Sequence, residues 1–481
     1  MKKMSKLIAI ILTLVLIVST FAACGKKAED ATKDAPATTE DTKATDVPAA
    51  TEAAAGEEKV DHIYFLNFKP ECEKIYASIA EDYKAETGIE VKVVTAASNT
   101  YQQVLTTELA KNDPPTIFQT NGPVGYELYK DYSADLKDTK LYSLASDKSL
   151  CITSGDGVYG IPYAVEGYGI IYNNAIMNKY FALANKATEY TSMDQINNFA
   201  ALKAVVEDMT ANKDALGIVG VFASTSFAAG EDWRWQTHLA NLPMFYEFKD
   251  NTAYDNSISA GLASATVEFK YAANFKNIFD LYVNNSCTER GLLSTKTVTD
   301  SMSEFALGQV AMVQNGNWGW GQISGTEGNV VVADDVKFMP IYTGVAGEET
   351  QGLCVGTENY FCINSKVSPA VQKASDDFLV WLFSSEKGKA YVKSADMGFI
   401  APFTSISASE GPEDPLAKEV LAWMSKDGVS SVPWTFAAFP SQAFKDAYGA
   451  ALLEYGQGTM EYDATVAVFK DMWASEYAAT H

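Results

Sequence analysis

The sequence has little positive charge, few histidines and no regular cysteine pattern, and each shortage excludes a class of protein. Its 37 lysines and arginines stand against 61 acidic residues, for a formal net charge of −24. Nucleic-acid-binding proteins hold phosphates with basic patches, so this composition argues against that function. Three histidines do not favour a histidine-based metal site. The six cysteines show no CxxC spacing, which fits neither a zinc site nor a disulfide framework. Cys354 and Cys362 could pair across a hairpin, but we expect buried free thiols.

The N-terminal segment predicts export. Three lysines precede an apolar run from Leu7 to Ala23, which is short for a membrane span and has the small-residue exit of a secretory signal. The run ends in Phe21-Ala22-Ala23-Cys24, which resembles the bacterial lipobox, whose cysteine is acylated and becomes the mature N-terminus. An ordinary secreted protein with an incidental Cys24 is the alternative. We therefore predict a signal peptide at 1–23 and, because residues 24–59 contain almost no large apolar side chains, a disordered tether after it.

From residue 60 onward, strand-like and helix-like segments alternate. The pattern predicts a buried strand at 63–66, a helix at 70–87 that Gly88 ends, strands at 89–95 and 116–119, and a helix at 101–111. Such alternation predicts βαβ units and a mostly parallel sheet, which binds ligands at the carboxyl ends of its strands. The loops at Asn67, Asn99 and Asn121 fall at those ends. Further helices are expected at 194–211, 371–394 and 441–455, so two α/β lobes are the economical fold.

Two patterns suggest enzymes but have simpler explanations. Residues 155–160 read GDGVYG and fit GxGxxG, but Ile161-Pro162 follows, and the residue before a proline is extended, so we predict a turn and no dinucleotide site. Glu231-Asp232 could serve as the carboxylate pair of a glycosidase, although chance pairing of surface acids is the better interpretation. The sequence contains no GxSxG, Walker A or HExxH motif.

Three segments combine aromatic rings with amides or carboxylates: 166–168 (EGY), 232–235 (DWRW) and 315–320 (NGNWGW). Sugars present apolar faces and a rim of hydroxyl groups, so a sugar site needs flat rings with polar groups at their edges. Core packing is the alternative for each tryptophan. We expect Trp318 to contact ligand because its loop is rich in glycine and asparagine. Trp381 and Trp423 lie on predicted helices and are expected to be structural.

Five blocks occur in the order typical of one family: AEDYKAETGIEV at 80–91, GIPY through IIYN at 160–173, GQVAMVQNGNW at 308–318, residues 374–391, and GFIAP at 398–402. With them, residues 60–481 resemble the extracellular solute-binding proteins of carbohydrate ABC importers, which include maltose-binding protein. The resemblance implies a class II periplasmic-binding-protein-like α/β fold, with two lobes, a hinge of crossing segments and a ligand cleft between the lobes. We assign 60–164 and 341–397 to lobe 1, and 165–340 and 398–481 to lobe 2.

The resemblance also implies binding residues. Glu166 matches a sugar-binding acid and Trp318 a stacking tryptophan. Asn121 stands where maltose-binding protein has an aspartate, and Phe118 where it has a tryptophan. Trp233 or Trp235 falls near a stacking tyrosine, and the region of Trp434 often adds another ring. The full predicted set is Asn67, Lys69, Asn99, Phe118, Asn121, Glu166, Tyr168, Trp233, Trp235, Trp318 and Trp434.

The function so implied is that of a monomeric binding protein without catalytic activity or cofactor. Anchored by lipid to the extracellular face of the bacterial cell membrane, it would capture a sugar, expected to be an oligosaccharide, and deliver it to an ABC permease. Two alternatives stay open: a secreted glycoside hydrolase, and a solute-binding protein for iron or a polyamine.

Overall fold

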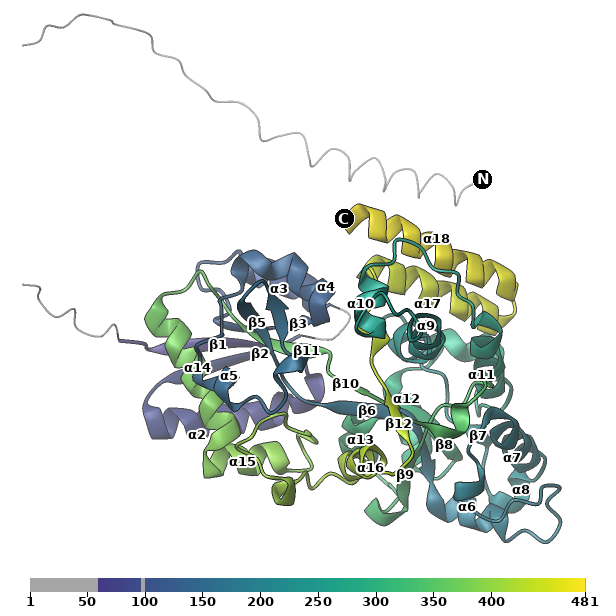
Figure 1. The fold of residues 1–481 in the computed structure, drawn as a ribbon. Helices are drawn as coiled ribbons and strands as arrows, with labels where there is room; N and C mark the ends of the chain where they lie inside the picture. The colour runs from purple at the N-terminus through teal and green to yellow at the C-terminus, as the bar shows by residue number, and fades with distance from the viewer. Residues whose placement is uncertain (1–58, 97–99, 481) are drawn as a thin grey trace, which may run out of the picture. The chain divides into compact units, whose positions relative to one another are not determined.

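Two β-sheets organise the part of the chain that the computed structural model describes, residues 59–96 and 100–480 (Figure 1). The first sheet has the order β2-β1-β3-β11-β5-β4, and the second has the order β12-β10-β6-β8-β7, with β9 paired to β6. The strands of the first sheet are β1 His62–Asn67, β2 Glu90–Thr95, β3 Ile117–Asn121, β4 Ile152–Ser154, β5 Gly157–Pro162 and β11 Asn359–Ile363. Those of the second are β6 Glu166–Asn173, β7 Gly220–Phe222, β8 Val310–Gly316, β9 Val336–Met339, β10 Gln351–Gly356 and β12 Ser430–Val432.

Helices cover both faces of the first sheet. On one face, alternate residues of β1 pack against α2 (Glu73–Thr87) and α14 (Pro369–Ser384). On the other, the intervening residues Tyr64 and Leu66 pack against α3 (Tyr101–Leu109) and the end of α4 (Gly122–Tyr129). The predicted helix at 70–87 is confirmed, with its first turn, Pro70–Cys72, as a 3-10 helix. Gly88 ends it at a φ of 78°, in the left-handed region that glycine tolerates.

The second sheet is also covered on both faces. One core contains α6 (Asn174–Phe181), α7 (Phe199–Ala211), α9 (Asn241–Phe248), α11 (Ala272–Asn284), α17 (Gln442–Gln457) and α18 (Tyr462–Thr480). The other contains α12 (Val298–Ala306), α13 (Trp320–Ser324) and α16 (Pro415–Met424). Figure 1 shows α17 and α18 side by side at the C-terminal, yellow end of the chain. The helices predicted at 194–211 and 441–455 correspond to α7 and α17.

The helix predicted at 371–394 is interrupted. Ser385 is extended, with a φ of −74° and a ψ of 155°, and its side chain accepts a hydrogen bond from Gly388 N. It therefore caps a separate helix, α15 (Glu386–Lys393), because a serine hydroxyl satisfies a backbone N–H that the first helical turn leaves unpaired. Trp381, on α14, packs against the first core and donates its indole N–H to Glu86. Trp423, on α16, donates to Phe338 O, so both tryptophans have the structural role predicted for them.

The prediction of a mostly parallel sheet is correct for β1, β2 and β3 and for the pairs β7–β8 and β10–β12, and wrong for the other pairs. The pairs β3–β11, β11–β5 and β5–β4 are antiparallel, and β6 is antiparallel to β8, β9 and β10. The reason is the path of the chain: β11 enters the first sheet from the second, at the edge where β3 ends, and must run back against it. Of the turn predicted at residues 155–160, residues 155 and 156 form the connection between β4 and β5, whereas residues 157–160 lie in strand β5.

Three segments connect the two sheet regions. Residues 163–165 link β5 to β6, residues 357–358 link β10 to β11, and residues 394–414 link α15 to α16. Val165 pairs with Ile400, so two of these segments lie side by side. Strand β10 belongs to the second sheet because it pairs with β6, although the sequence assigned 341–397 to lobe 1. Phe399 and Phe403 pack in the first core, although 398–481 was assigned to lobe 2. We call the two sheet regions lobe 1 and lobe 2 below; their exact limits stay a prediction.

In the described ranges, no helix combines the length and apolar character that crossing a membrane requires. The same residues contain no cluster of three side chains suited to a metal ion, and Cys354 and Cys362 are buried free thiols. The predicted signal peptide, Cys24, the tether up to residue 58, and Asn99 lie outside the described residues.

Candidate ligand-binding site

A buried ion pair joins the two lobes. Lys69 follows β1, Glu166 is the first residue of β6, and Lys69 Nζ lies 2.7 Å from Glu166 Oε1. The two residues are 7% and 4% exposed, and Glu71 Oε1 lies 3.7 Å from the same nitrogen. Burial by itself lowers the pKa of Lys69, but the Glu166 and Glu71 carboxylates outweigh it and raise that pKa above its ordinary value. The junction therefore holds a fixed cation and a fixed anion.

Asn67 positions this lysine. Its Oδ1 accepts a hydrogen bond from Lys69 N at 3.0 Å, and its Nδ2 donates to Lys69 O at 2.7 Å and to Thr95 Oγ1 at 3.1 Å. Because the amide is fully buried and its oxygen and nitrogen are both engaged, Asn67 shapes the turn after β1. Asn67, one of the predicted ligand-binding residues, therefore acts by positioning Lys69.

Four rings from three separate segments meet in lobe 2; we call them the aromatic cluster. Trp233 immediately precedes a π-helical turn, Arg234–Leu239, and His238 lies within that turn. Trp318 lies in a 3-10 turn after β8, and Trp434 precedes the turn Thr435–Ala438. The centroid of Trp318 is 5.9 Å from that of Trp233, 5.7 Å from that of His238 and 6.4 Å from that of Trp434. Lys69 Nζ lies 5.5 Å from the Trp318 ring, so the cluster adjoins the ion pair.

Two glycines let the indoles lie against strand ends. A Cβ at Gly316 would come within 2.2 Å of the Trp318 ring, and one at Gly356 within 2.6 Å of Trp434 Cγ. Real Cβ atoms do not approach so closely, so a side chain at either position would displace an indole. Behind the cluster, Tyr168 is fully buried, and its hydroxyl donates to His238 O at 2.8 Å. The tyrosine supports the cluster from the core side.

Lobe 1 contributes amides at the end of β3 and the start of β11. Asn121 and Asn359 are paired residues in this register, and Gln119 lies two residues before Asn121. In the described part of the chain, Gln119 Nε2, Asn121 Oδ1 and both polar side-chain atoms of Asn359 are buried without a hydrogen-bond partner. The next helix, α4, contacts the turn that follows Trp434, which brings this edge close to the aromatic cluster.

The aromatic cluster also contains buried polar atoms without a hydrogen-bond partner. Trp318 Nε1 and Trp434 Nε1 are buried and have no hydrogen-bond partner among the described residues. Each such group costs about 1–3 kcal/mol, and native proteins pair nearly all of them. Unpaired donors and acceptors from both lobes therefore gather around flat rings and one ion pair. This is the chemistry that a ligand with hydroxyl groups and apolar faces would satisfy.

Three predicted residues lie elsewhere or serve the core. Phe118 is fully buried in lobe 1 and packs with Tyr129 at a centroid distance of 6.4 Å. Trp235 is 3% exposed and stacks on Phe227 at 5.8 Å, inside the core of lobe 2. Tyr168 lies behind the cluster, as described above. By contrast, the structure brings Lys69, Glu166, Trp233, Trp318 and Trp434 together, and their contact with a ligand stays a prediction.

Sequence reasoning missed His238 and Asn359. His238 comes five residues after Trp233, which is one turn of a π-helix, and an α-helical period would not place the two on one side. The pKa of His238 lies well below its ordinary value, mainly because the ring is buried and also because the charged Arg234 is near, so the ring is neutral. Asn359 becomes visible only through the pairing of β11 with β3.

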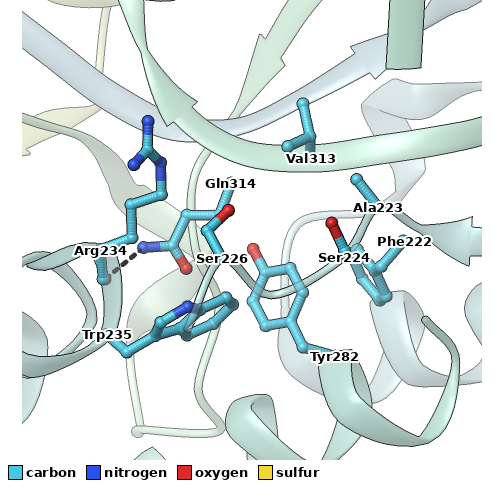
Figure 2. A pocket seen from close by; sticks show the side chains of 9 residues that line it. All are labelled: Phe222, Ala223, Ser224, Ser226, Arg234, Trp235, Tyr282, Val313 and Gln314. Carbon is cyan, nitrogen blue, oxygen red and sulfur yellow. Dashed lines mark hydrogen bonds between the residues drawn. The ribbon is translucent and has the colours of Figure 1, made fainter. Parts of the chain in front are cut away.

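A small cavity lies inside lobe 2 next to the cluster. Figure 2 shows it between Ser224, Tyr282 and Gln314, with the Arg234 guanidinium directed away from it. Its volume of about 10 Å³ suits one water molecule at most, so it is not the ligand site. The carboxylates of Glu231 and Asp232 have structural partners: Glu231 accepts from Val298 N, at the start of α12, and Asp232 accepts from Gln236 Nε2.

Two α/β lobes, three connecting segments and a polar, aromatic junction define the class of two-lobed solute-binding proteins. A family model described as bacterial extracellular solute-binding protein matches residues 78–420, and the chain belongs to that family.

Solved structures have the same fold. A chitin oligosaccharide binding protein has a TM-score of 0.67 at 17% identity, covering 88% of this chain and 100% of that chain. The solute-binding protein RafE, in complex with raffinose, has a TM-score of 0.64 at 16% identity, with 86% and 99% covered. A sugar transporter protein from Bacillus licheniformis, in complex with stachyose, has a TM-score of 0.61 at 16% identity, with 87% and 100% covered. A comparison with curated protein sequences gives no match.

Proposed function

We propose that this protein captures an oligosaccharide between its two lobes and delivers it to an ABC permease. The observation that carries the proposal is the gathering of buried, unpaired donors and acceptors around the aromatic cluster, beside the Lys69–Glu166 pair. Indole rings can stack on the apolar faces of sugar rings, while amides and charged groups bond the hydroxyls. The similar structures include a chitin oligosaccharide binding protein and complexes with raffinose and stachyose, which supports the same class of ligand here.

In this proposal the ligand holds the lobes together. Lobe 1 would contribute Lys69, Asn121 and Asn359, and lobe 2 would contribute Glu166 and the aromatic cluster. A ligand shifts an equilibrium only by its difference in affinity for the two states, so groups from both lobes must contact the sugar at once. The closed, loaded protein would then be the form that the permease recognises.

We also propose where the protein works. Membership of an extracellular family, together with the apolar run before Cys24, supports export and attachment through a lipid on that cysteine. The segment 24–59 would then act as a flexible tether with a reach on the order of 30 Å. The protein would act as a monomer on the extracellular face of the membrane.

A secreted glycoside hydrolase would need an acid and a second carboxylate on either side of the bond that it cleaves. The one adjacent pair that the sequence suggested, Glu231 and Asp232, has backbone and amide partners instead. This observation favours a binding protein.

Calorimetry with a panel of oligosaccharides of differing length and linkage tests the proposal, with the same samples analysed by chromatography afterwards. We expect saturable binding of at least one oligosaccharide with the sugar recovered intact. Recovery of shorter products would support the hydrolase. Binding of ferric iron or a polyamine, with no response to any sugar, would refute the proposed ligand class.

A further inference from the structure

Arg234 is one of two arginines in the sequence, and it is 2% exposed. Its guanidinium carbon lies 3.8 Å from the centroid of the Trp233 ring, on one face of that indole. Because Trp233 in turn contacts Trp318, the guanidinium lies beside the rings on which a sugar would stack. The arginine therefore adjoins the aromatic cluster.

Most of the hydrogen-bonding capacity of this side chain is unused. Nη2 donates to Asn315 Oδ1 at 3.1 Å, while Nε and Nη1 have no partner among the described residues. A guanidinium has five N–H groups, arranged as two edges that each offer a pair of parallel donors. Nη2 has one N–H on the edge that it shares with Nε and one on the edge that it shares with Nη1. Because only one of them bonds to Asn315, both donors of the other edge stay free. That edge is the fork that binds a carboxylate through two parallel hydrogen bonds.

No carboxylate of the described residues forms a salt bridge with Arg234. Glu231 and Glu71 act on it electrostatically, but the Glu231 carboxylate accepts from Val298 N, and Glu71 lies 3.7 Å from Lys69 Nζ. Burial lowers the pKa of Arg234 to about 9, which still leaves the group charged at neutral pH. A buried charge without a counterion is costly, so a ligand that supplies the counterion would remove part of that cost.

We propose that the ligand is an acidic oligosaccharide whose carboxylate or sulfate group is bound by the free edge of Arg234. This inference rests on the proposed function and narrows it from oligosaccharides to those that carry a negative charge. Two other cations lie near the junction: Lys69, already paired with Glu166 at 2.7 Å, and Lys445, which interacts electrostatically with Glu358. Arg234 differs from both lysines in offering a complete planar edge of two parallel donors to an anion.

The net charge of −24 does not oppose this ligand strongly. At physiological ionic strength, charges separated by more than about 8 Å are largely screened, so distant surface acids contribute little inside the junction. The local pairing of donors decides which ligand is bound.

The experiment uses matched ligands. Each neutral oligosaccharide of a panel is compared with the same oligosaccharide after its primary hydroxyls are oxidised to carboxylates, and with a third form in which they are sulfated. Calorimetry is performed on the wild type and on Arg234→Gln, Arg234→Lys and Arg290→Gln. Arg290 is the matched control because it is the other arginine and bonds to Gly456 O and Asn284 Oδ1 instead.

We expect the wild type to bind one of the charged forms at least about ten-fold more tightly than its neutral parent, the scale of one charged hydrogen-bonded pair. Arg234→Gln should lose this preference, Arg234→Lys should keep only part of it, and Arg290→Gln should keep all of it. Tighter binding of the carboxylate or of the sulfate identifies the anion.

Equal or tighter binding of the neutral forms by the wild type would overturn the inference and leave the proposed function intact. A panel in which no sugar of any form binds would overturn both. An unchanged preference in a folded Arg234→Gln would overturn the role of Arg234. If that variant fails to fold, Arg234→Lys tests the same role, because it keeps the charge and lacks the two-donor edge.

Discussion

Replacing Glu166 with glutamine removes the carboxylate that lies 2.7 Å from Lys69 Nζ and keeps the size of the side chain. In the ligand-free protein, Lys69 would be left 7% exposed, with Glu71 at 3.7 Å as its remaining carboxylate. Breaking a fully buried pair costs about 3–5 kcal/mol because a charge is left uncompensated. Since Glu71 compensates in part, we expect the free energy of unfolding to fall by about 1–3 kcal/mol.

The same change should weaken sugar binding. If Glu166 also accepts a hydrogen bond from a sugar hydroxyl, its loss should cost about 1.5–3 kcal/mol of binding free energy, the range for hydrogen bonds to charged groups. Chemical denaturation without ligand measures the first effect, and calorimetry with an oligosaccharide that binds the wild type measures the second. Glu419→Gln is the matched control, because Glu419 Oε1 lies 2.9 Å from Lys337 Nζ in a more exposed pair between α16 and β9.

The control should change stability by less than about 1 kcal/mol and leave binding unchanged. Two results would refute the reasoning about Glu166. A loss of stability with unchanged affinity would make Glu166 a structural residue at the lobe junction. A loss of affinity with unchanged ligand-free stability would show that the buried pair with Lys69 does not form in the free protein.

Three further predictions concern separate parts of the chain. Trp318→Ala should weaken sugar binding by about 2–4 kcal/mol in calorimetry, whereas the control Trp423→Ala should lower the melting temperature and keep the affinity; the reverse pattern would make Trp318 a core residue. Burial raises the pKa of Asp414 to about 7, so its carboxyl group binds a proton more tightly in the folded state than in the unfolded chain. The resulting stabilisation should be complete below about pH 4 and lost as the pH rises to 7, and chemical denaturation across this range should show that Asp414→Asn removes that part of the pH dependence. Cys24→Ser should release the protein from membranes in cell fractionation; a variant that still sediments with membranes would exclude a lipid on Cys24.

The elements that short-range patterns specify could be predicted from the sequence. The buried residues of helix α2 are Tyr76, Ile79 and Tyr83, which follow one another at intervals of three and four residues and so lie on one side of the helix. The helix ends at Gly88. Ile75, next to Tyr76 in the sequence, is only partly buried. Features that depend on contacts between distant parts of the chain could be predicted less completely from the sequence. The assignment of β10 to lobe 2 depends on its pairing with β6, and no local signal encodes that pairing.

The same contrast explains which tryptophans could be selected. The sequence predicts a ligand contact for Trp318 from its own loop, and Gly316, the glycine that admits its indole, lies two residues away. The glycine that admits Trp434 is Gly356, on a strand far away in the sequence, so its region gave only a weak signal. Composition favoured Trp235 as strongly as Trp233, because the two flank the same arginine. The π-helical turn separates them, directing one indole to the cluster and the other to Phe227 in the core.

The tryptophans of the aromatic cluster differ from those of the core in the pairing of the indole N–H, which a sequence does not display. Trp235 donates its indole N–H to Thr225 O, and Trp423 donates to Phe338 O, so both are complete within the fold. Trp318 and Trp434 have no such partner among the described residues, and Asn121 and Asn359 leave acceptors or donors unpaired across the junction. An aromatic ring fixed by packing but unpaired at its polar edge is suited to a partner from outside the chain. The unpaired edge of Arg234 extends this argument from hydroxyl groups to an anion, so the comparison of charged with neutral sugars is the sharpest test of the proposed ligand.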